Sequence, residues 1–206
     1  MKIGILISGR GSNMAALIDA VQGGQIPSSE AAVVISDKPE AAGLAKAAER
    51  GVPTLVIERR GRMRAEHDAE IASELQKRGV ELVCLAGYMR LLSPDFIRSF
   101  PNRIINIHPS LLPSFPGLNV QQQAIDHGVK ISGCTVHFVN EELDAGPIIV
   151  QRGVEVRDED TAETLAARIL VEEHKAYVDA VALIAAGRVG VTGNRTKIMD
   201  PQAGRK

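Results

Sequence analysis

The sequence predicts an α/β fold on a doubly wound, mostly parallel sheet, and three patterns carry this prediction. Continuous apolar segments alternate with helical segments through the first half of the chain, which predicts a Rossmann-like arrangement there. The strand segments are apolar throughout, as is typical of parallel strands covered by helices on both faces. Two longer strand segments and one long helix follow, so we expect an antiparallel strand pair and a C-terminal helix to extend the sheet.

The elements of the first half are recognised by their residue patterns and by the residues that end them. Helical spacing predicts three helices, and Gly51 and Gly79 come just after two of them, where glycine commonly ends a helix. Continuous apolar runs predict five strands, over residues 2–8, 32–36, 54–57, 82–86 and 104–107. The helices are predicted over residues 13–21, 40–49 and 64–78.

The second half of the chain has longer elements. Residues 132–139 and 147–156 predict two strands, joined by a polar loop that ends in glycine. Residues 161–186 predict one long helix, with Asp160 or Thr161 as N-cap and Gly187 as C-cap. Periodicity is lost from residue 190 onward. We therefore expect one domain over residues 1–189 and a weakly ordered tail over residues 190–206.

The composition of the chain favours small-molecule partners. Of the 206 residues, 45% are apolar and 24% are charged, which is ordinary for a globular protein. A net charge of −1 and only 3% aromatic residues argue against a nucleic-acid surface, which needs positive charge and stacking rings. No apolar run approaches the roughly 20 residues of a membrane helix, so no membrane contact is expected.

The two cysteines indicate the compartment. Cys84 and Cys134 each lie within an apolar strand segment, and the chain has no C-x-x-C pattern. We interpret both as buried, reduced thiols of a cytoplasmic protein. The sequence leaves a homodimer open.

A polar pair ends the fifth predicted strand. Residues two apart on a strand point to the same face, so Asn106 and His108 project side by side, and Pro109 stops the strand. The amide can hold a developing oxyanion, and the imidazole can move a proton near neutral pH, which suits acyl chemistry. Taken alone, however, such a pair is more often structural than catalytic, because short motifs recur by chance.

A glycine turn, residues 8–13, joins the first strand to the first helix. The N–H groups at the helix start, around residues 12–15, form an anion site. The Rossmann pattern needs a third glycine where Met14 stands, and no Gly-Lys-Ser/Thr follows, so we expect a single phosphate rather than NAD or ATP. A structural turn in which Ser12 or Asn13 caps the helix is a compatible alternative.

Two further polar groups are ambiguous. Asp144 lies in the loop between the last two strands, where a solvated aspartate is the default; beside an imidazole it would favour the protonated ring and fix its orientation. Arg64 and residues 89–92 could hold a flat, partly anionic ligand, although a surface arginine beside packed leucines is the simpler alternative.

Histidines and acidic residues also raise the question of a metal site. Glu172, Glu173 and His174, together with His108 and His137, supply suitable ligand types. No pair has the spacing of a helical zinc site, and no H-E-x-x-H occurs, so we expect no metal.

Four motifs occur together, in an order typical of one family. They are Gly9-x-Gly11-Ser12-Asn13, Ala86-Gly87-Tyr88-Met89-Arg90, Asn106-Ile107-His108-Pro109-Ser110-Leu111-Leu112-Pro113 and Leu143-Asp144-x-Gly146-Pro147-Ile148. From residue 1 to near residue 187, the chain resembles the phosphoribosylglycinamide formyltransferases, folate-dependent enzymes of purine synthesis. The N-x-H-P-S-L-L-P run and the later aspartate are common to all formyltransferases that use 10-formyltetrahydrofolate. The G-S-N loop narrows the resemblance to the glycinamide branch.

The resemblance implies an activity and a set of site residues. The amine of glycinamide ribonucleotide attacks the formyl carbon of 10-formyltetrahydrofolate, a co-substrate, directly. It implies a catalytic trio in which Asn106 and His108 stabilise the tetrahedral intermediate and Asp144 tunes His108. Implied ligands of the ribonucleotide are Gly11, Ser12, Asn13, Met14, Ala15 and Glu173. Implied ligands of the folate are Arg64, Met89, Arg90, Leu91, Leu92, Asn106, Asn140, Glu141, Glu142, Leu143 and Asp144.

The chain departs from the family pattern at two residues, and three other functions are possible for a chain of this kind. Ser114 and Asn119 stand at the substrate rim where some relatives carry Lys and His. Formyl transfer to an initiator tRNA should bring a basic C-terminal domain, and hydrolysis of the formyl folate an extra N-terminal regulatory domain, and we expect neither. A non-catalytic nucleotide-binding module would explain residues 9–13 but not the Asn106/His108 pair.

Overall fold

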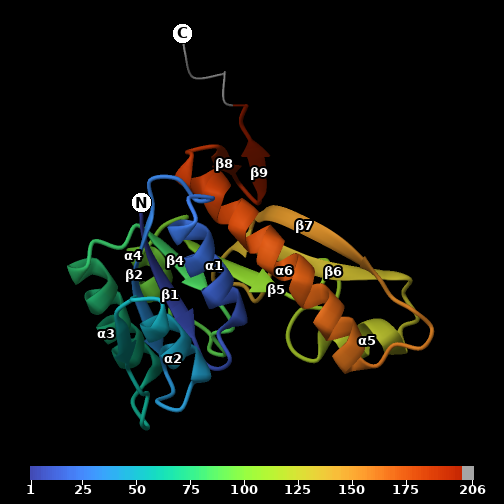
Figure 1. Cartoon of the computed structure of the whole chain (residues 1–206), viewed down its shortest axis with the longest axis horizontal. Coiled ribbons are helices and arrows are strands. Elements are labelled where there is room, and N and C mark those ends of the chain that lie inside the picture. The colour runs from blue at the N-terminus through green and yellow to red at the C-terminus, as the bar shows by residue number, and fades with distance from the viewer. Residues whose placement is uncertain (201–206) are drawn as a thin grey trace. The chain divides into compact units, whose positions relative to one another are not determined.

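The fold is described from a computed structural model of the chain, which describes residues 1–200 and is drawn in Figure 1. Contacts along the chain divide it into two compact units, Met1–Asn106 and Ile107–Lys206. We describe each unit by itself. That residues 1–189 act as one domain stays a prediction.

The first unit alternates strands and helices. Its strands are β1 (Lys2–Ile7), β2 (Glu30–Ser36), β3 (Thr54–Val56), β4 (Leu82–Leu85) and β5 (Ile104–His108), which runs across the boundary. Its helices are α1 (Ser12–Gln22), α2 (Ala42–Glu49), α3 (Arg64–Lys77) and α4 (Pro94–Ser99). β1 pairs in parallel with β2 and β4, β2 with β3, and β4 with β5. The strand order therefore reverses direction at β1 and β4, and ligands of such sheets bind beyond the strand ends at this reversal.

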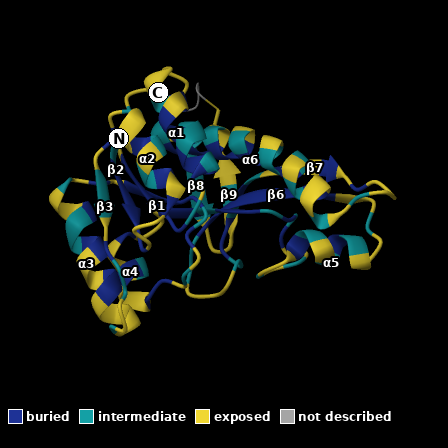
Figure 2. Ribbon diagram, turned by 60° about the horizontal axis from the view of Figure 1, so that its bottom comes forward, coloured by how far each residue is buried: buried dark blue, intermediate teal, exposed yellow. Residues whose placement is uncertain are grey.

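The core of the first unit lies on its central strands. Ile5, Leu6 and Ile7 of β1 are fully buried, and Figure 2 shows the same burial along the end of β2. α1 adds Leu17 and Ile18, four and five residues after Asn13, to this core. Burying each such side chain stabilises the fold by about 1.5–3 kcal/mol. Strands buried on both faces need no polar alternation, which explains their continuous apolar sequence.

The second unit is built on an antiparallel pair, β6 (Ile131–Phe138) and β7 (Ile148–Glu155). Its helices are α5 (Val120–Asp126) and α6 (Ala162–Ala185), and α6 packs on both strands of the pair. Leu165, Ile169 and Tyr177 lie at helical spacing on the buried side of α6. The Thr161 hydroxyl accepts a hydrogen bond from the Thr164 amide, which confirms Thr161 as the N-cap.

The strands together form one sheet in the order β3-β2-β1-β4-β5-β6-β7. The predicted fold class, a mostly parallel sheet extended by an antiparallel pair and a long helix, is confirmed. The short helices α4 and α5 were not predicted, because six or seven residues are too few to show helical periodicity. None of the helices within residues 1–200 has the length and apolar character to cross a membrane.

The expectation of a weakly ordered tail from residue 190 is wrong for the residues that follow α6. β8 (Val189–Thr192) and β9 (Arg195–Ile198) form an antiparallel hairpin, and the Thr196 hydroxyl donates to the Ile148 carbonyl of β7. The turn is Gly193-Asn194, and Gly193 has the positive φ of 57° that short hairpin turns require. The Gly193-Asn194 dipeptide is typical of hairpin turns and could have predicted this hairpin. Residues 201–206 lie outside the described residues.

Two glycines of the second unit are required by close backbone approach. A Cβ atom on Gly146 would lie 1.9 Å from the Phe138 carbonyl oxygen, and one on Gly133 would lie 2.0 Å from that of Arg152. The Phe138 amide also donates to the Pro147 carbonyl at 2.9 Å. The contacts of Phe138 with Gly146 and Pro147 close the base of the loop between β6 and β7, which carries Asp144, whereas Gly133 lets the two strands approach within the pair.

Candidate functional site

His108 and Asp144 lie side by side in the second unit. Nδ1 of His108 is 3.5 Å from Oδ2 of Asp144, although the two residues are 36 positions apart in the sequence. Both side chains are buried, with exposed fractions of 6% and 10%. The predicted proximity of imidazole and carboxylate is therefore confirmed. The catalytic role of the pair stays a prediction.

The other nitrogen of the His108 ring also faces an acceptor. Nε2 lies 2.9 Å from the carbonyl oxygen of Phe115, which can only accept a hydrogen bond. Nε2 therefore carries a proton, and Nδ1 faces a carboxylate. The His108 ring is thus held between a carbonyl oxygen at Nε2 and a carboxylate at Nδ1.

Asp144 is held in place by its own contacts. Its Oδ2 accepts a hydrogen bond from the Gly117 amide at 2.9 Å. Its backbone is left-handed, with a φ of 51°, a conformation that aspartate tolerates better than most residues. The carboxylate is thus oriented by the loop that carries Phe115 and Gly117 as well as by the loop to which Asp144 belongs.

A second histidine, which the sequence analysis considered only as a metal ligand, also faces Asp144. Nε2 of His137 lies 3.8 Å from Oδ1 of Asp144, and Nδ1 bonds the Phe138 carbonyl at 2.9 Å. Burial lowers the pKa of His137, so this ring is neutral near pH 7. Asp144 therefore stands between two imidazole rings. The place of His137 within a predicted strand, residues 132–139, was the available signal for it.

Asn106 lies in β5, two residues before His108. Both side chains are on the same face of that strand, because side chains alternate along it. Asn106 is half-buried, whereas His108 is buried. The predicted side-by-side placement of amide and imidazole is consistent with this strand.

The remaining predicted residues of the 140–144 loop are mostly exposed. Oδ1 of Asn140 accepts a hydrogen bond from the Glu142 amide at 3.1 Å, which forms a local turn. Leu143 exposes 56% of its surface. Among the residues of this loop, Asp144 lies beside His108, and a folate role for the others stays a prediction.

The glycine turn of the first unit is compact and fastened to α2. Gly11 has a φ of 66°, and a Cβ atom there would lie 2.8 Å from the Cα atom of Gly43. The Gly43 amide donates to the Gly9 carbonyl at 3.0 Å, and the Lys46 ammonium donates to the Arg10 carbonyl at 2.9 Å. Only glycine satisfies both the backbone conformation and the close approach at residue 11.

The turn leads directly into α1, but the residue that caps the helix differs from the expected one. Gly11 is the N-cap and Ser12 is the first helical residue, so neither Ser12 nor Asn13 caps the helix. The Ala15 amide donates to the Gly11 carbonyl at 3.0 Å, so this N–H group is already used within the helix. The anion site over residues 11–15 stays a prediction, in which the Ala15 amide is already bonded to Gly11.

A cavity of about 200 Å³ in the first unit brings together four of the predicted folate residues. Arg64, Met89, Arg90 and Leu91 all line it. Leu92 does not, because its side chain is buried in the core. The cavity wall also includes three residues that the sequence analysis missed: Arg59, His67 and Asp68.

Two buried polar residues of α3 explain why Arg64 meets the segment after β4. The His67 ring bonds the Ile57 carbonyl at 2.7 Å, and Oδ2 of Asp68 accepts the Ser93 amide at 2.6 Å. These bonds connect the start of α3 to the chain just after β3, at Ile57, and to the chain after β4, at Ser93. A histidine and an aspartate on the apolar side of a helix, with Ile71, were the signal that could have identified them.

Arg90 is oriented by a buried carboxylate. Its Nε donates to Oδ2 of Asp37 at 2.5 Å, and the Asp37 side chain is only 2% exposed. Nearby, burial raises the pKa of the Tyr88 hydroxyl, which therefore stays neutral. The cavity wall thus offers arginine cations, one of which is held by the buried carboxylate of Asp37. Such a wall suits a ligand that carries carboxylates.

Glu173 is buried on α6, in the second unit, whereas Gly11 and its neighbours belong to the first. That the two contribute to one ribonucleotide site stays a prediction. Within residues 1–200, no three His, Cys, Asp or Glu residues are grouped so that they could hold a metal ion.

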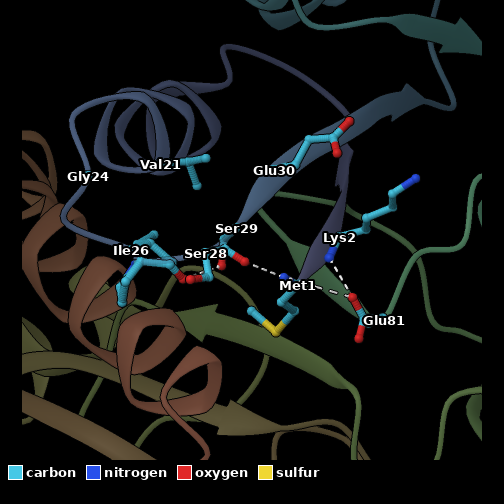
Figure 3. Close-up of a pocket in the computed structure, with 10 residues that line it drawn as sticks. Met1, Lys2, Val21, Gly24, Ile26, Ser28, Ser29, Glu30 and Glu81 are labelled. Carbon is cyan, nitrogen blue, oxygen red and sulfur yellow. Dashed lines mark hydrogen bonds and ion pairs between the residues drawn. The ribbon is translucent and has the colours of Figure 1, made fainter.

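A larger cavity, of about 530 Å³, lies at the other edge of the first unit (Figure 3). Met1, Lys2, Glu30 and Glu81 line it, at the starts of β1 and β2, and the Lys2 amide donates to Glu81 at 2.8 Å. Ligands of parallel sheets bind beyond the carboxyl ends of the strands. We therefore assign the candidate site to the smaller cavity and to the strand ends that surround it.

Comparisons with known proteins agree on one group. The model of the formyl transferase family matches residues 1–181. Phosphoribosylglycinamide formyltransferase of Escherichia coli K12 is 40% identical over 94% of this chain and 92% of its own length. The crystal structure of glycinamide ribonucleotide transformylase 1 from Symbiobacterium toebii superposes with a TM-score of 0.95 at 51% identity, covering 97% of this chain and 94% of that one.

A larger protein also contains a matching region. The trifunctional purine biosynthetic protein adenosine-3 of Bos taurus is 47% identical over 94% of this chain. The match spans only 19% of the length of that protein. The resemblance predicted from the four motifs is thus confirmed.

Proposed function

The chain belongs to the formyl transferase family, and from this premise we propose that it transfers the formyl group of 10-formyltetrahydrofolate to the amine of glycinamide ribonucleotide. The product is formylglycinamide ribonucleotide, an intermediate of purine biosynthesis. The observation that carries this proposal is the buried His108–Asp144 pair, with 3.5 Å between Nδ1 and Oδ2. A pair of this kind suits acyl transfer, because it supplies a proton donor where negative charge develops.

The phosphate of the ribonucleotide is assigned to the start of α1. Gly11 turns the backbone into the start of the helix, where the helix dipole favours an anion. The Ser12 hydroxyl adds a donor. Glu173, on α6, is assigned to the ribose, whose hydroxyl groups are donors to a carboxylate.

The folate is assigned to the 200 Å³ cavity and to the 140–144 loop. The exposed side chains of Met89 and Leu91 offer apolar surface to its aromatic rings. Arg64 and Arg90 offer cations to its carboxylates. Asp37 holds Arg90 in place, so this cation is partly pre-oriented for its ligand.

The transfer itself needs no nucleophile from the protein. The amine nitrogen of the ribonucleotide forms a bond to the formyl carbon, and the carbonyl oxygen becomes an oxyanion. Asn106 and His108 donate hydrogen bonds to that oxygen. The intermediate then breaks its bond to the folate nitrogen. That nitrogen gains a proton and the attacking nitrogen loses one, with His108 placed to assist.

The resting contact of His108 suggests how the oxyanion is received. The Nε2 proton is directed at the Phe115 carbonyl at 2.9 Å. A formyl oxygen that enters the site can share the Nε2 proton with the Phe115 carbonyl, so the ring keeps this contact and does not need to rotate. Asp144 holds the other side of the ring, at Nδ1.

The expected partners are these two small molecules, and the expected compartment is the cytoplasm. The free, buried thiols of Cys84 and Cys134 support a reducing compartment. Burial raises the pKa of Cys134 to about 12, so this thiol does not ionise near pH 7 and takes no part in the chemistry.

The test is a formyl-transfer assay on the purified protein. Loss of 10-formyltetrahydrofolate is followed with glycinamide ribonucleotide present and absent, and the formylated product is identified by mass. We expect turnover that depends on the amine. Amine-independent loss of the formyl group would instead identify a hydrolase, and tight binding of both molecules without turnover would identify a non-catalytic module.

A further inference from the structure

A chain of buried hydrogen bonds lies behind His108, and the transfer mechanism does not use it. The Ser110 hydroxyl donates to the Ser114 carbonyl at 2.6 Å and to the Phe115 carbonyl at 3.1 Å. The Phe115 oxygen is the acceptor for Nε2 of His108. Ser110 is fully buried. One carbonyl oxygen therefore receives both the catalytic imidazole and a buried hydroxyl.

The segment after His108 is fastened to β6 by a second hydroxyl. The Thr135 hydroxyl donates to the Ser110 carbonyl at 2.7 Å and accepts the Leu112 amide at 3.0 Å. Thr135 is also fully buried. Its hydroxyl therefore holds the backbone on both sides of Leu111, which lies between His108 and Phe115 in the sequence.

A side chain from β7 completes the chain of bonds. Nε2 of Gln151 donates to the Leu112 carbonyl at 2.8 Å and to the Thr135 hydroxyl at 3.0 Å. The residue itself is on the exposed side of β7 and reaches inward to these acceptors. Gln151 thus closes a continuous sequence of contacts that runs through Thr135 and Ser110 to the Phe115 carbonyl.

We propose that Ser110, Thr135 and Gln151 are positioning residues that hold the Phe115 carbonyl and thereby the His108 ring. This inference rests on the proposed function, because it assigns the three residues to the service of the reacting imidazole. The ring is held at Nδ1 by Asp144 and at Nε2 by Phe115. If the Phe115 carbonyl moves, the second of these contacts is lost and the ring can rotate away from the reactive orientation.

The chemistry of the three side chains fits this task better than simple packing. The Thr135 hydroxyl both donates and accepts within the protein, and the Ser110 hydroxyl donates to two carbonyls, so both are fixed in orientation. A backbone segment that lacks regular structure obtains its rigidity from such bonds. An isosteric apolar residue would fill the same volume but would leave carbonyl and amide groups of residues 110–112 unpaired. Hydroxyl chemistry and packing can therefore be separated by substitution.

The experiment compares Thr135→Val with Thr135→Ser. Valine keeps the shape and removes the hydroxyl, whereas serine keeps the hydroxyl and removes a methyl group. We expect Thr135→Val to lower kcat by ~100-fold, with little change in either KM. A displacement of a catalytic group by about 1 Å can cause a loss of this size. Thr135→Ser should retain most of the kcat of the wild type, even if its thermal midpoint falls.

A second readout does not depend on activity. The nitrogen-15 chemical shifts of the His108 ring report which nitrogen is protonated. In the wild type we expect Nε2 to be protonated, as its bond to Phe115 requires. In Thr135→Val we expect Nε2 to lose this fixed signature. In Thr135→Ser it should remain.

Gln151→Met provides a variant at an exposed position, which does not threaten folding. We expect a smaller decrease in kcat, because the hydroxyls of Ser110 and Thr135 remain. The inference is overturned if Thr135→Val and Thr135→Ser have equal kcat values, or if the ring shifts of His108 are the same in all variants. If instead the wild type transfers no formyl group, the proposed function fails, whereas the nitrogen shifts still test the positioning.

Discussion

Asp144 binds the Gly117 amide and faces His108 with the same carboxylate oxygen. Oδ2 lies 2.9 Å from the Gly117 nitrogen and 3.5 Å from Nδ1 of His108. The opposite side of the His108 ring meets Phe115, two residues before Gly117. One short segment therefore orients both the imidazole and its carboxylate.

Replacing Asp144 by Asn tests the carboxylate. The amide keeps the size and can keep the Gly117 contact, but it removes the negative charge that faces Nδ1 of His108. We expect a lower turnover number at every pH, because the ring loses the carboxylate that orients it. The measurement is kcat/KM against pH for both proteins. Matching rates and matching profiles would make Asp144 a loop residue without a catalytic role.

Replacing Asn106 or His108 by Ala tests the oxyanion contacts. Loss of one donor to an oxyanion typically lowers turnover by roughly 100- to 1,000-fold. We expect each variant to bind the ribonucleotide almost as well as the wild type, because the phosphate is assigned to α1. Turnover and ribonucleotide affinity are measured separately. A parallel loss of both would point to a folding defect rather than to catalysis.

Replacing Gly11 by Val tests the phosphate loop. A side chain at this positive φ is strained, and its Cβ would lie 2.8 Å from Gly43. We expect the KM for the ribonucleotide to rise far more than the KM for the folate. Gly51→Val is the matched control, because Gly51 also has a positive φ, of 71°, but has no atom within 4 Å of the added Cβ. Equal effects on both substrates would contradict the assignment.

Replacing Arg64 by Gln tests the folate cavity. Arg64 lines the cavity, and its cation is assigned to a carboxylate of the co-substrate. We expect a higher KM for 10-formyltetrahydrofolate, by roughly tenfold for the loss of one charged hydrogen bond of about 1.5 kcal/mol. Arg98→Gln removes an exposed arginine of α4 and serves as the control. A change confined to the KM of the ribonucleotide would place Arg64 in the other site.

Replacing Asp160 by Asn tests a pH-dependent contribution to stability. Hydrogen bonds from Arg168 and from the Arg157 amide hold the pKa of Asp160 well below its usual range. A carboxyl group with a lowered pKa in the folded state stabilises the fold above its ordinary pKa, near 4, and this contribution is lost as the pH falls below that value. We expect Asp160→Asn to lower the thermal midpoint at pH 7 and to reduce the difference between pH 7 and pH 3. Identical midpoints of the two proteins at pH 7 would exclude this contribution.

Local patterns sufficed to predict the elements of the first half and the presence of several site residues. Continuous apolar runs identified β1, β2 and β4, because strands buried on both faces contain few polar residues. Gly11 was identified as a turn residue from its place between a strand and a helix. The motif that contains Asn106 and His108 needed no tertiary information, because both residues lie on one strand.

The contacts between distant segments were decided by the tertiary structure. Asp144 and His137 reach the same carboxylate–imidazole cluster only because β6 and the loop after it return to the end of β5. His67 and Asp68 bring Arg64 to the segment after β4 through bonds that no sequence spacing predicts. Sequence determines local geometry through backbone preferences and periodicity. The pairing of remote side chains depends on strand order and loop path, which emerge only when the whole chain packs.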